Sequence, residues 1–429
     1  MQSRKSSGNK KSFASRLPFF YGWIIVAVII ASGFIMMGVN STFGVFFNSL
    51  ADEFNLTRAS TSAILSIRMV FSAIACLLAG WAIDRYGPRK VFTVMGMFVG
   101  LSMVLTGLTT SSWQIYITYG LLMAFGAGAV YVVITATVLH WFNRKRGLAI
   151  GLTGVGGGIG IATISPTSAS FIGSIGWRET MFLLGGLSWL IMLPAAQLLK
   201  KTPGEIGAFA DGDPAPDMPQ TATITETEPL NMRQLFLDIN FWAVFFIWLF
   251  MAFSMFFVMT HIVPHTVDIG FSEVEAATIL SLSGIAQIIG RLFSGIISDR
   301  VNAKGIAIVS SALQFVAILS LIWIRELWML YLYGFINGIT FASFGTAITV
   351  LIGRIFTLSD IGKVLGILEV GIYVGGAIGP YLGGLIFDSS GSYNLAFIIM
   401  SAAVLARIIL VFILRVKPTD KIEMHKYPA

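Results

Sequence analysis

One short pattern occurs twice in this chain, at an offset of about half the chain length. It reads GWAIDR at 80–85 and GIISDR at 295–300, which is 215 positions later (295 − 80) in a chain of 429 residues. The stretch ILS at 64–66 recurs at the same offset, at 279–281. Each copy of the pattern ends an apolar stretch, so the repeated unit is a membrane unit. Such a chain is expected to fold as two similar halves, which is typical of carriers that open alternately to the two sides of a membrane.

The amount of apolar sequence excludes a soluble globular protein. Hydrophobic residues make up 56% of the chain and charged residues 11%, and the mean hydropathy is +0.82, whereas soluble chains carry roughly 25% charged residues. Stretches that reach the roughly 20 apolar residues needed to cross a bilayer recur twelve times. Because lipid offers the backbone no hydrogen-bond partners, these continuous apolar runs must be helices. The expected spans are 20–47, 60–83, 91–109, 113–140, 148–172, 178–199, 239–264, 274–298, 305–324, 328–353, 364–386 and 394–415.

The distribution of Lys and Arg predicts the orientation of the chain. Of its 28 Lys and Arg residues, three lie inside spans and three, Arg58, Arg178 and Arg325, lie in connections on one side. The others lie in the two tails and in the connections on the opposite side. Loops rich in Lys and Arg stay in the cytoplasm, so we expect a multi-pass protein of the plasma (inner) membrane with both termini cytoplasmic. The net charge of +7 then reflects topology and contact with anionic membrane lipids, and no nucleic acid partner is expected.

A linker separates the two halves. The stretch 200–238 is rich in proline and acidic residues and cannot bury a core, although its end at 232–241 could form an interfacial helix. The predicted parts are a cytoplasmic tail at 1–18, a six-helix bundle at 19–199, the linker at 200–238, a second six-helix bundle at 239–415 and a cytoplasmic tail at 416–429.

Two local signals repeat between the halves. Thr57 and Ser272 precede the second and eighth spans at equivalent positions, and each is predicted to cap the helix that follows. Glycine recurs every four residues from Gly371 to Gly383 in the eleventh span and is abundant at 147–160 in the fifth. Glycine lets helices approach closely, and the sequence leaves open whether these faces pack statically or slide.

No pattern typical of an enzyme occurs. The sequence contains no HExxH, no GxSxG and a single cysteine, Cys76, so an enzyme, a metal site, a cofactor and an internal disulfide are not expected. A channel would need a polar ring contributed by several subunits, and the duplication favours a self-contained carrier instead. His261 and His265, near the outer face, are interpreted as residues of the membrane interface.

The first copy of the repeated pattern is the most specific signal in the chain. With the residues that follow, it reads GWAIDRYGPRK at 80–90 and resembles the signature between the second and third helices of the major facilitator superfamily. The resemblance implies an all-α membrane protein of twelve transmembrane helices in two pseudo-symmetric six-helix bundles. It also implies charge contacts that close the cytoplasmic side in one state; the alternative is a loop whose cations serve orientation alone. The gating candidates are Gly80, Asp84, Arg85, Arg89, Asp299 and Arg300.

Three further stretches resemble a narrower branch of that superfamily. They are WFNRKRGLAIG at 141–151, YGW at 21–23 and PGEIG at 203–207, and they are similar to sequences of the monocarboxylate transporters and the oxalate/formate antiporters. This resemblance implies that Arg291 binds a substrate carboxylate, which suits a guanidinium with its paired N–H donors. The alternative is an arginine that extends to the cytoplasmic interface. The animal relatives carry an aspartate four residues earlier, where this chain has Gln287, which can contact substrate but cannot take up a proton.

The remaining charged residues inside spans are further candidates, because ionisable groups in a bilayer are costly. Glu369 is the coupling candidate: it could pair with Arg291 and take up a proton when a substrate competes for that arginine. It could instead form a structural ion pair with Arg407. Arg68 could contact a second anion or backbone carbonyls. In the oxalate/formate antiporters a lysine lies on the eleventh helix, whereas here Lys363 stands only at the helix entrance, which disfavours a dicarboxylate.

The other candidates for substrate binding are uncharged. Tyr131 lies where related carriers have a substrate-contacting tyrosine, and its hydroxyl could donate to a carboxylate or belong to a packed aromatic. Asn40 and Ser41 are polar positions midway along the first span, and Phe341 and Phe344 are expected to form apolar walls.

Together these features predict a secondary active transporter for a small organic anion. The anion is expected to be a monocarboxylate that crosses the plasma membrane by alternating access, with a proton as a candidate second partner. The alternative is an exporter of drugs or other amphiphilic small molecules from the same superfamily.

Overall fold

The computed structural model describes residues 20–128, 137, 141–142, 146–206, 208–209, 211, 232–298, 302–356 and 361–415. Within these ranges the side chains of residues 80, 84, 146–151, 153, 232, 295–298 and 361–366 are not described.

All regular structure in these residues is helical. Eleven helices are long and apolar enough to cross a membrane, and they match every predicted span except the fourth, 113–140, which extends beyond the described residues. The first helices are α1 (Gly22–Ser41), α2 (Phe43–Phe54), α3 (Arg58–Tyr86), α4 (Pro88–Gly107), α5 (Ser112–Ile115), η2 (Tyr116–Leu122), α6 (Met123–Ala127), α8 (Arg146–Ile175) and α9 (Trp177–Leu198). They are followed by η3 (Pro203–Ile206), α10 (Met232–Leu237), α11 (Ile239–Asp268), α12 (Glu273–Ser298), α13 (Ala303–Ser320), α14 (Leu327–Ile355), α15 (Ile361–Ser390) and α16 (Asn394–Ile413).

The ends of two helices show the predicted caps. The hydroxyl of Thr57 accepts a hydrogen bond from the backbone N–H of Ser60 (3.2 Å) at the start of α3. The hydroxyl of Ser272 accepts from the backbone N–H of Glu275 (3.3 Å), and the Glu275 carboxylate accepts in return from the backbone of Ser272 (2.8 Å). Both capping predictions are confirmed. At the other end of α3, Gly87 adopts φ +81°, a conformation that favours glycine.

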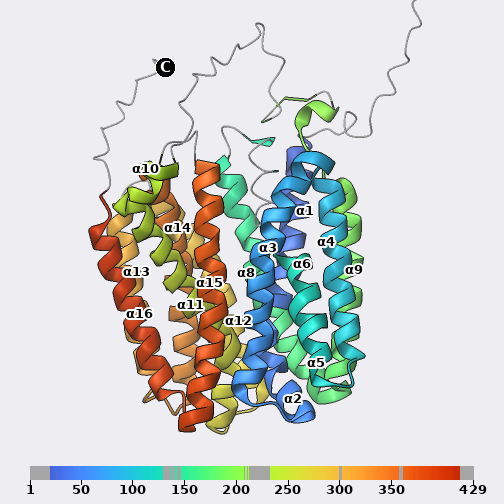
Figure 1. The fold of residues 1–429 in the computed structure, drawn as a ribbon, viewed down its shortest axis with the longest axis vertical. Helices are drawn as coiled ribbons and strands as arrows, with labels where there is room; N and C mark the ends of the chain where they lie inside the picture. The colour runs from blue at the N-terminus through green and yellow to red at the C-terminus, as the bar shows by residue number, and fades with distance from the viewer. Residues whose placement is uncertain are drawn as a thin grey trace, which may run out of the picture.

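The helices form two groups that lie side by side (Figure 1). The first bundle holds α1 to α9 and the second holds α11 to α16, with contacts between α3 and α15, between α8 and α12 and between α2 and α11. In Figure 1, α10 lies at one end of the helices and α2, which leads into Arg58 of α3, lies at the other. We call these the α10 end and the Arg58 end. Helix α12 runs from the Arg58 end to the α10 end, and α8 runs in the opposite direction.

The glycine-rich faces have different neighbours. A β-carbon at Gly375 or Gly379 would stand 2.1 or 2.5 Å from a backbone oxygen of α11, so the Gly371–Gly383 face packs within the second bundle. In α8, Gly156 and Gly160 pack against the backbone of α1 in the same bundle. Gly158 instead faces α12 across the two bundles. The glycines of α15 therefore pack against α11, and Gly156 and Gly160 of α8 pack against α1, in each case within one bundle. Only part of the glycine pattern, such as Gly158, belongs to the contact between the bundles.

Candidate functional site

At the Arg58 end, hydrogen bonds join the two bundles. The guanidinium of Arg58 donates to Oδ1 of Asp268 at the end of α11 (2.6 Å) and to the hydroxyl of Tyr393 before α16 (2.7 Å). It also lies over the ring of Phe387 of α15, 4.0 Å from the ring centroid. We call Arg58, Asp268, Asp388 and Tyr393 the Arg58 cluster.

The side chain of Asp388 in the second bundle also joins the two bundles, because it binds the main chain at the start of α3 in the first. Its two carboxylate oxygens accept hydrogen bonds from the backbone N–H groups of Arg58 (2.9 Å) and Ala59 (2.8 Å). These groups belong to the first turn of α3, where backbone donors have no partner within the helix and where the helix dipole favours an anion. A carboxylate of the second bundle therefore caps a helix of the first, and the Arg58 cluster joins the two bundles at this end.

His261 extends this contact toward the interior. Its Nδ1 lies 3.0 Å from the hydroxyl of Tyr393, and its Nε2 lies 2.7 Å from the carbonyl of Pro380 and 3.4 Å from the hydroxyl of Ser62. The side chain is only 1% exposed, and His265 is buried as well. The interpretation of both histidines as membrane-interface residues is wrong, because α11 turns them toward neighbouring helices rather than toward the membrane surface.

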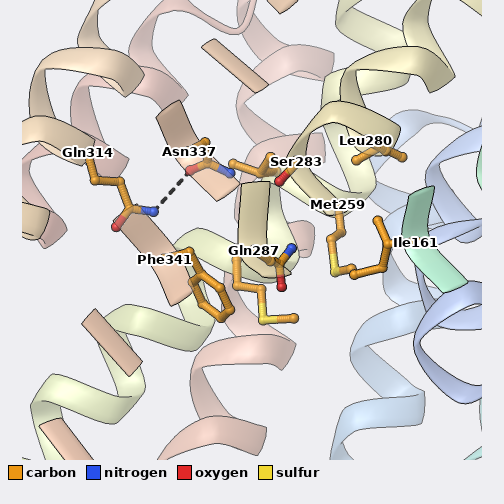
Figure 2. Close-up of a pocket in the computed structure, with 10 residues that line it drawn as sticks. Ile161, Met259, Leu280, Ser283, Gln287, Gln314, Asn337 and Phe341 are labelled. Atoms are coloured by element: carbon orange, nitrogen blue, oxygen red, sulfur yellow. Dashed lines mark hydrogen bonds between the residues drawn. The ribbon is translucent and has the colours of Figure 1, made fainter. Parts of the chain in front are cut away.

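A small cavity of about 30 Å³ lies about halfway along α12, bordered by α8 of the first bundle and by α11 to α14 of the second (Figure 2). This volume has room for roughly two water molecules. Its polar walls are formed by Ser283, Gln287, Gln314 and Asn337, and every residue that lines it is uncharged. Phe341, predicted as an apolar wall of the substrate site, lines this cavity.

A chain of directed hydrogen bonds reaches this cavity from α16. Arg407 is fully buried, and its Nη2 donates to Oε1 of Gln314 (2.7 Å). Nε2 of Gln314 in turn donates to Oδ1 of Asn337 (3.0 Å), the bond drawn in Figure 2. The ring centroid of Phe344, predicted as a second apolar wall, lies 4.1 Å from Cζ of Arg407. Phe344 is fully buried there and does not line this cavity.

Gln287 lines the cavity, and Arg291 lies one helical turn closer to the α10 end. Arg291 is exposed, and its guanidinium lies against Gly154 of α8, since a β-carbon at Gly154 would stand 2.1 Å from Nη1. One turn toward the Arg58 end, Gly158 gives similar room to Ile288. Because Gly154 has no side chain, α8 leaves room for Arg291 in the contact between the two bundles.

A second buried arginine lies in the first bundle. Arg68 is 2% exposed, its Nη2 donates to Oδ1 of Asn40, and it lies 5.7 Å from the ring centroid of Tyr119. Its Nε and Nη1 are buried without a hydrogen-bond partner in the described part of the chain. Asn40 thus contacts Arg68, whereas Ser41 is fully buried and bonds to the hydroxyl of Ser165 of α8 (2.6 Å).

Glu369 of α15 lies in the contact between α15 and α3. It is 8% exposed and lies near Cys76 of α3 and Tyr373 of α15. The hydroxyl of Tyr373 donates to the carbonyl of Gly128 (2.6 Å). The pairing of Glu369 with Arg407 is wrong: in the described residues Arg407 bonds to Gln314, because α16 turns it toward α13 and away from α15.

Arg85 and Arg89, two of the gating candidates, lie near the α10 end. Arg85 contacts the rings of Trp81 and Tyr86, 5.5 and 5.7 Å away, and Arg89 donates twice to Gln197 of α9 (2.9 and 2.6 Å). All these contacts lie within the first bundle. The structure describes only the backbone of Gly80, Asp84 and Lys363, and Tyr131, Asp299 and Arg300 lie outside the described residues.

Several residues that organise this region were not identified from the sequence. Gln314 and Asn337 form polar walls of the cavity, and Asp268 and Asp388 join the bundles at the Arg58 end. The sequence could have indicated Gln314 and Asn337, because each is an amide near the middle of an apolar span, where a polar group without a hydrogen-bond partner is costly.

Sequence and structure comparisons agree with this architecture. The chain is similar to monocarboxylate transporter 11 of Homo sapiens (23% identity, covering 90% of this chain and 81% of the relative). It is also similar to monocarboxylate transporter 13 of Rattus norvegicus (26%, covering 90% and 87%). Among solved structures, it resembles a bacterial homologue of the human lysosomal transporter Spinster in an inward-facing, unoccupied conformation (TM-score 0.68, 15% identity, covering 91% and 94%).

A second solved structure with the same fold is that of the nucleoside transporter NupG, in a mutant form (TM-score 0.71, 13% identity, covering 91% and 99%). The sequence profile of the Major Facilitator Superfamily matches residues 29–327 and 266–425. The chain therefore belongs to the Major Facilitator Superfamily, as a multi-pass membrane protein of the transporter fold.

Proposed function

We propose that this protein is a secondary active transporter that moves a small organic monocarboxylate across the plasma membrane by alternating access. The observation that carries the proposal is the position of Arg291. It lies in the contact between the bundles, against Gly154, one turn from Gln287 in the wall of the cavity. A guanidinium there offers paired donors to a carboxylate, and the uncharged walls of the cavity suit a small organic remainder. The similarity to monocarboxylate transporters supports the same substrate class.

The two ends of the carrier act as gates in this proposal. The excess of Lys and Arg at the α10 end assigns that end to the cytoplasm, so the Arg58 cluster closes the opposite, outer end. Arg85 and Arg89 make their described contacts within the first bundle, which fits a cytoplasmic end that is not held shut. Closing it would bring the region of Asp84 and Arg85 against the second bundle while the Arg58 cluster separates.

Glu369 is the proposed coupling residue. Gln287 cannot carry a proton, whereas Glu369 is a buried acid in the contact between α3 and α15. These two helices belong to different bundles, so their contact changes when the bundles rock against each other. The environment of a carboxyl group at that position, and with it the group's affinity for a proton, therefore differs between the two states. Coupling to a proton gradient requires such a difference.

Uptake into proteoliposomes tests the proposal. The purified protein should take up one or more labelled monocarboxylates, and Arg291→Lys should lose most of this uptake while it still inserts and folds, because lysine keeps the charge but lacks the paired donors. Arg325→Lys, in an exposed connection of the second bundle, is the matched control and should keep full uptake. Full uptake of every tested acid by Arg291→Lys contradicts the anchor, and transport of amphiphilic drugs without any carboxylate contradicts the proposed substrate class.

A further inference from the structure

The charge of Arg407 fixes the orientation of the amide groups of Gln314 and Asn337 in the wall of the cavity. The carbonyl and amino groups of Gln and Asn side chains can exchange places by a half-turn, so each amide can present either a donor or an acceptor. Arg407 removes this freedom, because a guanidinium only donates hydrogen bonds. Its bond to Gln314 therefore requires the oxygen of Gln314 to face Arg407.

The same logic carries the orientation to the cavity. With its oxygen toward Arg407, Gln314 presents its amino group to Asn337, and Oδ1 of Asn337 accepts that bond at 3.0 Å. The amino group of Asn337 is then directed away from Gln314. In Figure 2 the nitrogen of Asn337 lies on the side of Ser283, at the wall of the cavity. Within the described residues, no hydrogen bond of this nitrogen to protein is found.

The arrangement is rigid as well as directed. Gln314 is 2% exposed and Arg407 is fully buried, and the guanidinium of Arg407 is held over the ring of Phe344. Nε and Nη1 of Arg407 have no hydrogen-bond partner in the described part of the chain, so Gln314 is its described acceptor. An inverted Gln314 would turn an amino group toward a buried cation, which is strongly unfavourable.

We propose that Asn337 binds an oxygen acceptor of the substrate, and that Arg407, acting through Gln314, is a positioning residue that sets the donor face of the cavity. The inference rests on the proposed function in that it takes this cavity as part of the substrate path. It makes the substrate a molecule that carries, besides the group held by Arg291, a hydroxyl or carbonyl oxygen. A purely aliphatic acid would leave the Asn337 donor unpaired.

The test compares ligands that differ by one oxygen atom. Binding of lactate and propionate, and of their neutral amides lactamide and propionamide, is measured by thermal stabilisation of the purified full-length protein. In the wild-type protein the hydroxylated member of each pair should bind about three- to tenfold more tightly, as one added hydrogen bond allows. The amide pair lacks the carboxylate, so it reports on the cavity independently of Arg291.

Two substitutions invert the orientation without removing volume. In Gln314→Glu the new carboxylate accepts from Arg407 and can only accept from Asn337 as well. The Asn337 amide must then make a half-turn, which directs its amino group at the carboxylate and Oδ1 of Asn337 toward the cavity. In Asn337→Asp an acceptor faces the cavity directly. Both should abolish or reverse the preference for the hydroxylated ligand in both pairs. Asn394→Asp, an exposed amide-to-acid change on α16, should leave both ratios unchanged.

The outcomes separate the two proposals. If the wild type prefers neither hydroxylated ligand, or if both Gln314→Glu and Asn337→Asp keep the wild-type ratios, the inference is overturned, while loss of acid binding in Arg291→Lys would still support the proposed function. If the wild type binds neither acid but prefers lactamide over propionamide, the monocarboxylate assignment fails and the role of Asn337 stands. Absence of binding by all four ligands overturns the inference.

Discussion

Replacing Asp388 by alanine should shift the carrier toward the state that is open at the Arg58 end. A substitution changes a conformational equilibrium only through contacts that differ between the two states. The carboxylate of Asp388 belongs to the second bundle and accepts from the backbone of Arg58 and Ala59 in the first. These bonds must therefore break when the Arg58 end opens.

The size of the shift follows from the capping geometry. Loss of a helix-capping acceptor typically costs ~1 kcal/mol, within a range of about 0.5–2 kcal/mol. Asp388 accepts two backbone N–H groups, at 2.9 and 2.8 Å, but it is exposed, so water partly replaces it in the variant. We expect ~1–2 kcal/mol, and because ~1.4 kcal/mol corresponds to tenfold, the closed-to-open ratio should fall roughly five- to thirtyfold.

Electron–electron distance measurements between two spin labels would detect this shift. Thr110 and Glu326 are exposed residues in connections at the Arg58 end, one in each bundle, and cysteines can be placed there after Cys76 is replaced by serine. Asp388→Ala should increase the population of long distances. Combining it with Asp268→Ala removes the ion pair to Arg58 as well and should increase that population further.

Asp238→Ala is the matched control. Asp238 caps α11 by accepting from the backbone of Asn240 (2.8 Å), and both residues belong to one segment near the α10 end. Its loss should lower thermal stability but leave the distances unchanged. If Asp388→Ala alone and together with Asp268→Ala give the same distances as Asp238→Ala, the reasoning about the Arg58 cluster is refuted.

Three further substitutions probe the other parts of the site. Gly154→Ala should weaken monocarboxylate uptake by at least severalfold, because the added β-carbon displaces the Arg291 side chain, whereas Gly173→Ala on the same helix meets no atom within 4 Å and should transport normally; equal uptake by the two variants argues against Arg291 as the anchor. Asp84→Asn should leave substrate affinity largely intact and increase the labelling of cysteines placed at the α10 end; unchanged labelling counts against a gating role. Glu369→Gln should abolish accumulation driven by an acidic exterior yet permit exchange of labelled for unlabelled substrate, and continued accumulation would make Glu369 a structural residue.

The sequence predicted those features that depend on local chemistry. Eleven of the spans appear where apolar length placed them, and the caps at Thr57 and Ser272 form as their residue types favour. The fold could be predicted because a membrane-spanning stretch has few alternatives to a helix. The duplication predicted the two bundles because two copies of one membrane unit are expected to fold as similar halves.

The partners of buried polar residues could not be predicted. Glu369 and Arg407 lie on consecutive spans, and their sequence positions allowed an ion pair, but the rotation of α16 turns Arg407 toward Gln314. That rotation is set by packing along the whole helix, which no local pattern records. His261 is a similar case, because α11 turns it toward Pro380 and Tyr393. The Arg291–Gly154 contact likewise depends on how two distant spans pack together.

The contacts at the Arg58 end should leave different traces in the evolution of the chain. The bond between Arg58 and Asp268 joins two side chains, so a change in one selects for a change in the other. Asp388, in contrast, binds main-chain N–H groups, which every residue except proline supplies. Covariation between positions would therefore reveal the first contact and miss the second. A proline at 58 or 59 would suit the first turn of a helix and still remove one of the two donors that Asp388 binds.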